Sequence, residues 1–228
     1  MNKIIIIITI LCIILFLIAI YTKMRLDYSQ NLADILYKKE DPKQYLEELR
    51  SSRAKLFISK KNIELMKLNV YQMVDDVDNI YKEYEIIDKL KLSKSERLNY
   101  NSAKLNYFIR DKKYQEAKTI LDEIAKDSEN INSVESKKIF KECETIYRLN
   151  VLHDKTLKDD ILQEINNIDD KNIIFVAYIR IAKLLFLNGE DKKEIDNYLN
   201  LAKNVCSNKQ NLTVINNCLK DNRLLENI

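Results

Sequence analysis

Apolar positions follow two different patterns along the chain. Residues 4–21 read Ile-Ile-Ile-Ile-Ile-Thr-Ile-Leu-Cys-Ile-Ile-Leu-Phe-Leu-Ile-Ala-Ile-Tyr and carry no charge and only one strongly polar side chain, Thr9. As a helix rising about 1.5 Å per residue, this run spans roughly 27 Å, close to the hydrocarbon thickness of a bilayer. After it, apolar residues recur every three or four positions between charged ones, which predicts amphipathic helices. We therefore expect a transmembrane anchor over 1–22, a juxtamembrane helix or linker over 23–41 and a helical domain over 42–228.

Capping chemistry marks the expected ends of the helices. Asp41-Pro42 places a side-chain acceptor at the N-cap and Pro at N1, and Ser93–Glu96 has the order of a capping box. Asp191–Glu194 is a looser acidic version, and Gly189 fits the positive-φ position that follows a helix. With the periodicity, these signals predict helices joined by short turns into antiparallel hairpins, the second with a candidate break near Asp75-Asp76. The predicted helices are 42–58, 62–90, 94–110, 113–127, 133–152, 156–168, 171–188, 191–206 and 209–225.

Composition decides the fold class. The chain has one Gly and one Pro in 228 residues, whereas sheets need these residues at turns and bulges and α/β folds need Gly at strand-to-helix crossings. We therefore expect an all-α protein. The 38 Lys and Arg residues nearly balance the 35 Asp and Glu residues and alternate with them, which argues against nucleic acid as a partner. The many Ile, Lys and Asn residues are typical of an AT-rich, bacterial genome.

The alternative interpretation of the apolar run is a cleaved signal peptide. Signal peptides have shorter apolar regions and end in a small-x-small site, which Ala19-Ile20-Tyr21 is not. We therefore favour an uncleaved anchor with the lipid bilayer as its partner. Lys3 precedes the run, and Lys23 and Arg25 follow it together with further basic residues. This bias predicts a single-pass membrane protein with a cytoplasmic body, and an extracytoplasmic body is the alternative.

The predicted hairpins resemble one another. Residues 103–108 precede Asp111-Lys112-Lys113, residues 182–187 precede Asp191-Lys192-Lys193, and residues 143–147 fit the same frame between them. Helix-turn-helix units repeated every 34–40 residues or so are typical of α-solenoids. The region 175–205, and in part 94–127, resembles the tetratricopeptide repeat (TPR) family. The residues that match the family's packing positions are Ala103, Ala117, Leu121, Tyr178, Ala182, Gly189, Leu199 and Ala202.

The resemblance implies a right-handed, TPR-like α-solenoid of about four hairpins, whose first helices line a concave groove that binds a protein or peptide. Asn106, Tyr107, Asn150 and Lys183 lie on these first helices and are the candidate groove residues. The implied function is that of a membrane-anchored adaptor or scaffold. A generic helical bundle with Ala at its tight crossings is the alternative fold.

The predicted helix 62–90 indicates an alternative function, self-association. Its apolar residues alternate at spacings of four and three, as in a coiled coil, and a parallel coiled coil would make the protein a self-associating structural membrane protein, a homo-oligomer. Val74 and Tyr81 widen the apolar face, however, which favours packing within the chain. The stripe consists of Met66, Val70, Met73, Val77, Ile80, Tyr84 and Ile87.

Candidate catalytic and metal-binding residues are few. Asp75, Asp76 and Asp78 have no neighbouring His and no Gly loop to complete a site, so we interpret them as a solvated face. The only histidine, His153, is expected at a helix end, and the three cysteines after residue 22 lack CxxC spacing and read as buried thiols. One Gly leaves no phosphate-binding loop or dinucleotide fingerprint. We expect no enzyme activity, no cofactor and no metal; an enzyme built from helix carboxylates is the alternative.

Overall fold

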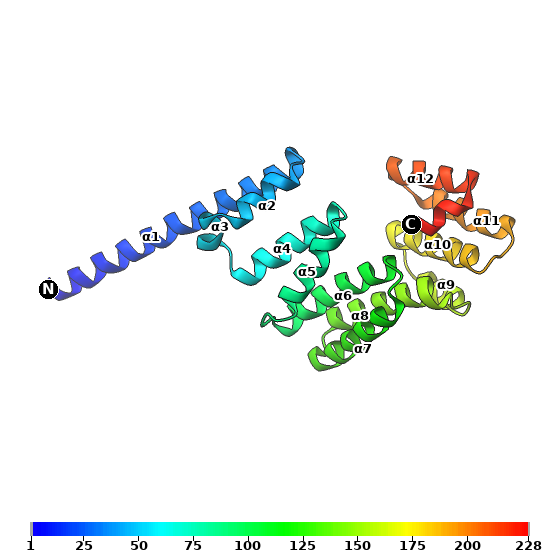
Figure 1. Cartoon of the computed structure of the whole chain (residues 1–228), viewed down its shortest axis with the longest axis horizontal. Coiled ribbons are helices and arrows are strands. Elements are labelled where there is room, and N and C mark those ends of the chain that lie inside the picture. Colours follow the sequence, from blue (N-terminus) through cyan, green and yellow to red (C-terminus); the bar gives the residue numbers. More distant parts are fainter. Residues whose placement is uncertain (1, 228) are drawn as a thin grey trace. The chain divides into compact units, whose positions relative to one another are not determined.

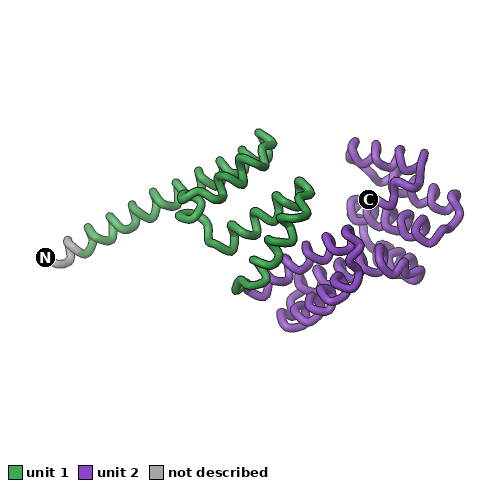
Figure 2. The backbone as a smooth tube through the Cα atoms, in the orientation of Figure 1, with its two compact units in different colours: residues 1–92 green, residues 93–228 purple. Residues whose placement is uncertain are grey.

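The computed structural model describes the backbone of residues 2–227 and the side chains of residues 7–226, and within these limits every regular element is a helix (Figure 1). The chain forms two compact units, residues 1–92 (unit 1) and residues 93–228 (unit 2) (Figure 2). Unit 1 contains α1 (Asn2–Ala33), η1 (Asp34–Lys38), α2 (Pro42–Arg50), α3 (Ser52–Phe57), α4 (Lys60–Met73) and α5 (Val77–Ile87). Unit 2 contains α6 (Lys94–Arg110), α7 (Tyr114–Ile131), α8 (Val134–Tyr147), η2 (Arg148–Leu152), α9 (Leu157–Ile165), α10 (Lys171–Leu187), α11 (Lys192–Val205), α12 (Lys209–Lys220) and η3 (Asn222–Asn227).

Helix α1 has two halves with different surroundings. It is long and apolar enough to span a membrane, and the described side chains up to residue 26 are exposed. Beyond them, Tyr28 and Leu32 are buried against the rest of unit 1. The juxtamembrane segment is therefore helical and continuous with the apolar run, and it ends in the π-turn η1.

Six described residues have positive φ, and five of them recur at similar intervals; the sixth, Asn132 at φ 51°, ends α7. Glu40, Asp75, Lys112, His153 and Gly189 all have φ between 50° and 69°, and they are separated by 35, 37, 41 and 36 residues. Each follows one helix and precedes the next, so the described residues form five helical hairpins. The first helices of the hairpins are α1–η1, α4, α6, α8–η2 and α10, and the second helices are α2–α3, α5, α7, α9 and α11.

Three of these turns share one hydrogen-bond pattern. The N–H of Gly189 donates to the Phe186 carbonyl, and the N–H of Glu190 donates to the Leu185 carbonyl, both at 3.0 Å. The same two bonds, three and five residues back, close the turns at Asp75 and Lys112. This is a Schellman ending, which satisfies carbonyls at the helix C-terminus. Gly189 confirms the predicted positive-φ glycine, while the other turns adopt this conformation with side chains that prefer other regions.

Two predicted helices are interrupted. The helix predicted over 42–58 breaks at Ser51, whose side chain accepts the N–H of Ala54 and caps α3. The candidate break near Asp75-Asp76 in the helix predicted over 62–90 is confirmed, and the first part of that helix is α4. It ends at Met73, and after the turn Asp76 caps α5 by accepting the N–H of Asn79. In both cases a polar side chain satisfies the orphan donors of a new helix, which allows the chain to turn.

These breaks change the assignment of hairpins. Residues 42–90 were expected to form one hairpin, but α2 and α3 are the second arm of a hairpin whose first arm is the end of α1. The hydroxyl of Tyr28 donates to the Glu48 carbonyl at 3.1 Å, and that of Tyr21 donates to the Leu56 carbonyl at 3.0 Å. The earlier residue of α1, Tyr21, contacts the later residue of the second arm, Leu56. The two arms are therefore antiparallel. Helices α4 and α5 form the next hairpin by themselves.

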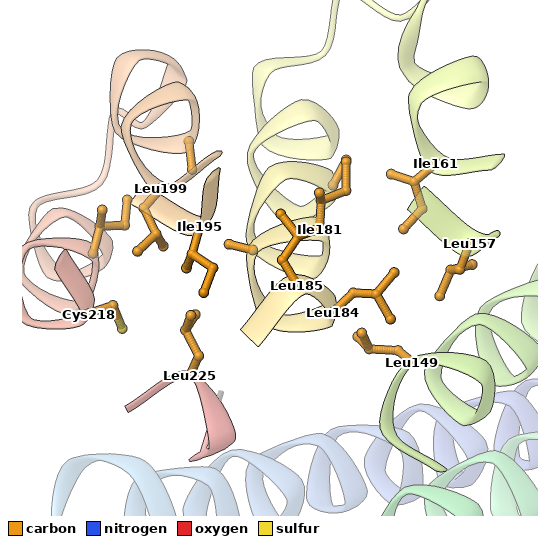
Figure 3. Packing of buried hydrophobic residues seen from close by; sticks show 14 residues of the cluster. Leu149, Leu157, Ile161, Ile181, Leu184, Leu185, Ile195, Leu199, Cys218 and Leu225 are labelled. Carbon is orange, nitrogen blue, oxygen red and sulfur yellow. The ribbon is translucent and has the colours of Figure 1, made fainter. Parts of the chain in front are cut away.

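The core of unit 2 is formed by the later hairpins. Buried residues of α9, α10, α11, α12 and η3 form one continuous cluster, in which Ile181 and Leu184 of α10 lie between α9 and α11 (Figure 3). Leu199 of α11 and Leu225 of η3 are fully buried at the other side of the cluster. Leu225 joins the last described helical turn, η3, to this core.

Most of the predicted repeat-packing residues are buried, but Ala103 is exposed, and its assignment is corrected. The sequence match pairs Ala103 with Ala182, 79 residues later, whereas the left-handed residues of the two hairpins are 77 residues apart. In this register the equivalent of Ala182 is Leu105, which is fully buried. Tyr178 is half-buried with its ring 6.2 Å from that of Tyr198. The buried members are Ala117, Leu121, Ala182, Leu199 and Ala202.

Candidate interaction groove

A hollow in unit 2 lies along the first helices of its hairpins. It has a volume of about 650 Å³ and is lined by side chains of α6, α8–η2 and α10, with η3 at one end. Ile109, Ile146 and Ile179 give it an apolar surface. Ligand pockets usually measure about 300–1,000 Å³ and combine apolar walls with a few polar groups. The hollow is open to solvent, so we describe it as a groove, and it suits an extended ligand better than a small enclosed one.

Basic side chains outnumber acidic ones along this groove. Arg110, Lys112, Arg180 and Lys183 line it, against Glu226 as the acidic residue. Since opposite charges attract more strongly where water is partly excluded, the groove favours a ligand that carries negative charge.

Two of these cations are held in place by contacts within the unit. The guanidinium of Arg180 forms a two-pronged pair with a residue of α8, Glu142, with Nη1 3.1 Å from Oε2. The guanidinium of Arg110 stacks 4.8 Å from the ring centroid of Tyr107. A two-pronged carboxylate contact or an aromatic face restricts the planar guanidinium to a narrow range of orientations. Both guanidinium groups are therefore preorganised, and the charge of Arg180 is already paired with Glu142.

Lys183 has an unusual position at the floor of the groove. It is 8% exposed, and its Nζ donates to the backbone carbonyl of Glu226 at 3.3 Å. Burial lowers the pKa of this ammonium, and the nearby Glu226 carboxylate opposes part of that change. Among the described residues this carbonyl is its one acceptor, and the desolvation of the ammonium is incompletely offset by so long a bond.

The structure brings three of the four predicted groove residues together. Asn106, Asn150 and Lys183 all line this groove. Asn106 and Lys183 lie six residues before the left-handed residues Lys112 and Gly189, so they occupy equivalent places in two hairpins. Tyr107, in contrast, is buried beneath Arg110 and acts as its support.

Sequence reasoning missed Arg110 and Arg180 as groove residues. Both lie on first helices, but their role depends on which face of α6 and α10 turns inward. The spacing of Asn106 from Arg110, one helical turn, is the signal that could have found the first of them. His153, predicted at a helix end, is the left-handed residue of its hairpin and lines the groove edge.

Candidate catalytic groups do not gather at this groove. Among the described residues, no group of three or more His, Cys, Asp or Glu side chains is placed to hold a metal ion. Asp76, one of the acidic cluster, is engaged as the cap of α5, where it also accepts the side-chain amide of Asn79 at 2.7 Å. The thiols of Cys143 and Cys218 are buried, and burial raises the pKa of each.

Compared with protein family models, curated proteins and solved structures, the chain matches none of them. Its resemblance to tetratricopeptide repeats therefore rests on the sequence positions named above.

Proposed function

We propose that this protein is a membrane-anchored adaptor, in which a TPR-like right-handed α-solenoid binds an acidic peptide segment of a partner protein. Two features support the solenoid: the hairpins recur every 35–41 residues, and three of them close with the same Schellman turn. Repeats of this length that stack side by side bury one continuous core and expose a long concave face. Helix α1 is the proposed single-pass anchor, with the body in the cytoplasm as the Lys and Arg bias favours.

The groove of unit 2 is the observation that carries the binding function. It runs over the first helices of three successive hairpins and places basic groups beside an apolar floor. An extended peptide could lay apolar side chains on the isoleucines and place carboxylates near Lys112 and Lys183. The proposed function involves recognition without covalent chemistry.

Peptide binding to the full chain in detergent micelles tests this proposal. Fluorescently labelled peptides of matched length, one acidic, one neutral and one basic series, are titrated and followed by polarisation. We expect the acidic series to bind, and Lys112→Glu to weaken its binding by about tenfold, which corresponds to about 1.4 kcal/mol.

The matched control is Lys126→Glu, on the exposed face of α7 outside the groove. It makes the same charge change, so a general electrostatic effect would weaken binding equally in both variants. Equal effects of the two variants, or equal binding of the three peptide series, would overturn the proposed groove.

Sidedness is tested separately, by protease accessibility in intact cells of a tag placed after Ile228. Protection of the tag supports the cytoplasmic body, and cleavage overturns it in favour of an extracytoplasmic one.

Self-association is not our preferred function, because the helix that carried it is divided. Met73 and Val77 of the apolar stripe are exposed on either side of the turn, while Ile80 and Tyr84 are buried within the α4–α5 hairpin. An uninterrupted coiled coil over 62–90 is therefore not available. Oligomerisation by another surface stays a prediction, which sedimentation of the full chain in density-matched detergent would test.

A further inference from the structure

Helix α3 lies beside the end of the apolar run, although about 30 residues of the chain separate the two. The Tyr21 hydroxyl of α1 donates to the Leu56 carbonyl, and the Tyr21 ring lies 5.7 Å from that of Phe57 (Figure 1). Tyr21 is the last residue of the apolar run. Its contacts therefore place α3 beside the end of that run along the axis of α1. In the proposed anchored state, α3 and the α3–α4 turn then lie at the level where the hydrocarbon core meets the headgroups.

This segment is strongly basic. Between residues 50 and 61 there are five Lys and Arg residues and no Asp or Glu. Two more basic residues follow Tyr21 on α1, and all seven side chains are at least partly exposed. We call this surface the basic collar, and it consists of Lys23, Arg25, Arg50, Arg53, Lys55, Lys60 and Lys61.

A hollow opens within the collar. It has a volume of about 400 Å³ between α2–α3 and α4, and four cations, one carboxylate and three apolar side chains line it: Arg50, Lys55, Lys60, Lys67, Glu64, Leu49, Ile58 and Ile63. On α3, Leu56 is 60% exposed and follows Lys55 directly in the chain. An exposed aliphatic side chain on a basic segment matches the boundary between acyl chains and anionic headgroups.

We propose that the basic collar binds anionic lipid headgroups next to the anchor, so that unit 1 lies on the bilayer surface. This inference rests on the membrane anchoring proposed above and is independent of the peptide groove. The seven cations give the electrostatic attraction, and Leu56 enters the interface. A soluble acidic partner would need the same charges but would not bring Leu56 to the lipid.

The chain has no Trp, so a single introduced one reports its own surroundings. Leu56→Trp places the reporter in the collar, where the backbone carbonyl that binds Tyr21 is retained. Met73→Trp is the matched control, since Met73 is 55% exposed at the opposite end of α4, about 20 Å away along a helix of 14 residues. The full chain is reconstituted into phosphatidylcholine vesicles or into equal mixtures with phosphatidylglycerol, with the same brominated phosphatidylcholine as quencher.

We expect the L56W variant to show shorter-wavelength emission and stronger quenching in the anionic vesicles, and added salt to reduce both changes. Neutralising Arg53, Lys55 and Lys60 to Gln should abolish the response. Neutralising Lys82, Lys89 and Lys91, exposed on unit 1 outside the collar, should leave it intact.

Two outcomes would overturn the collar. Quenching of L56W that is equal in neutral and anionic vesicles would show that the headgroups are not recognised, and an equal response of M73W would show a general effect of the anionic surface. Flotation after alkaline extraction distinguishes failure of the collar from failure of the anchor. Protein that is lost from the vesicles contradicts the anchor and the collar together. Protein that stays with them without a collar response contradicts the collar alone.

Discussion

A buried carboxylate in the α4–α5 hairpin makes the stability of unit 1 depend on pH. Glu83 is 3% exposed, and its Oε1 has no hydrogen-bond partner within the described residues. Lys67 lies between it and a second carboxylate, with Nζ 3.3 Å from Glu83 Oε2 and in direct contact with Glu64. Burial, followed by the hydrogen bond shared with Glu64, raises the pKa of Glu83 to about 7, and Lys67 opposes part of the change.

The sign of the effect follows from proton linkage. In the unfolded chain Glu83 has an ordinary pKa near 4.5, so between the two values the folded state holds more protons than the unfolded state. Folding is then favoured at the acidic end of this window and loses stability as pH rises through the folded pKa. With about 1.4 kcal/mol for each pKa unit, unit 1 should be about 2–3 kcal/mol less stable at about pH 8 than at about pH 5.

Urea denaturation of the full chain in detergent, carried out across this pH range, measures the effect. The M73W variant supplies a fluorescent reporter in the same hairpin, and Glu83→Gln in that background removes the titrating group while keeping its size. We expect the loss of stability towards alkaline pH to disappear in the Gln variant. A Gln variant with the unchanged pH slope, or a parent whose stability rises over this range, would refute the reasoning.

Two further predictions concern unit 2, each measured by urea denaturation. Leu199 is fully buried in α11, so Leu199→Ala should lower the free energy of unfolding by about 2–5 kcal/mol. Val134→Ala, at a position 75% exposed, should change it by less than about 0.5 kcal/mol. Similar losses in the two variants would contradict the described core. Gly189→Ala should cost about 1–2 kcal/mol because φ is 69° with open space around it, and Lys112→Gly, at φ 59°, should stabilise by up to about 1 kcal/mol. A change of the same sign in the free energy of unfolding of both variants would show that backbone conformation does not determine the stability effect of these substitutions.

Local chemistry predicted the helix boundaries best where a side chain caps the helix. Ser93 and Glu96 form the predicted reciprocal capping box, and Asp41 accepts the N–H of Gln44 before Pro42. Each of these interactions spans three residues, so the sequence contains all of the necessary information.

The grouping into hairpins was harder to predict, because four of its five turns have no glycine. Glu40, Asp75, Lys112 and His153 adopt positive φ at some cost in energy. Asp and His are enriched in this conformation, but Asp occurs at many other positions of the chain and His also occurs in other roles, so they do not mark a turn as a glycine does. The register error at Ala103 has the same origin. The first hairpin was missed because residues 23–41 were predicted as a juxtamembrane helix or linker and were not paired with 42–58, although Tyr28, Leu32 and Ile35 follow helical spacing.

The groove was predictable in part. Asn106 and Lys183 share a repeat position, which a comparison of hairpins can detect in the sequence. The inward placement of Arg180 depends on its pairing with Glu142, 38 residues earlier, and such long-range pairs leave no local pattern. The basic collar is a similar case, because α3 reaches the end of the apolar run only through folding.

The continuity of α1 has a mechanical consequence. One helix supplies both the apolar run and the Tyr28 and Leu32 side chains that fix the first hairpin, with no break in the backbone between them. A bilayer thinner than the apolar run makes such a helix lean, and a thicker one makes it stand upright. In the proposed anchored state, unit 1 would tilt through the same angle as α1, so that bilayer thickness would set the angle at which this unit meets the membrane.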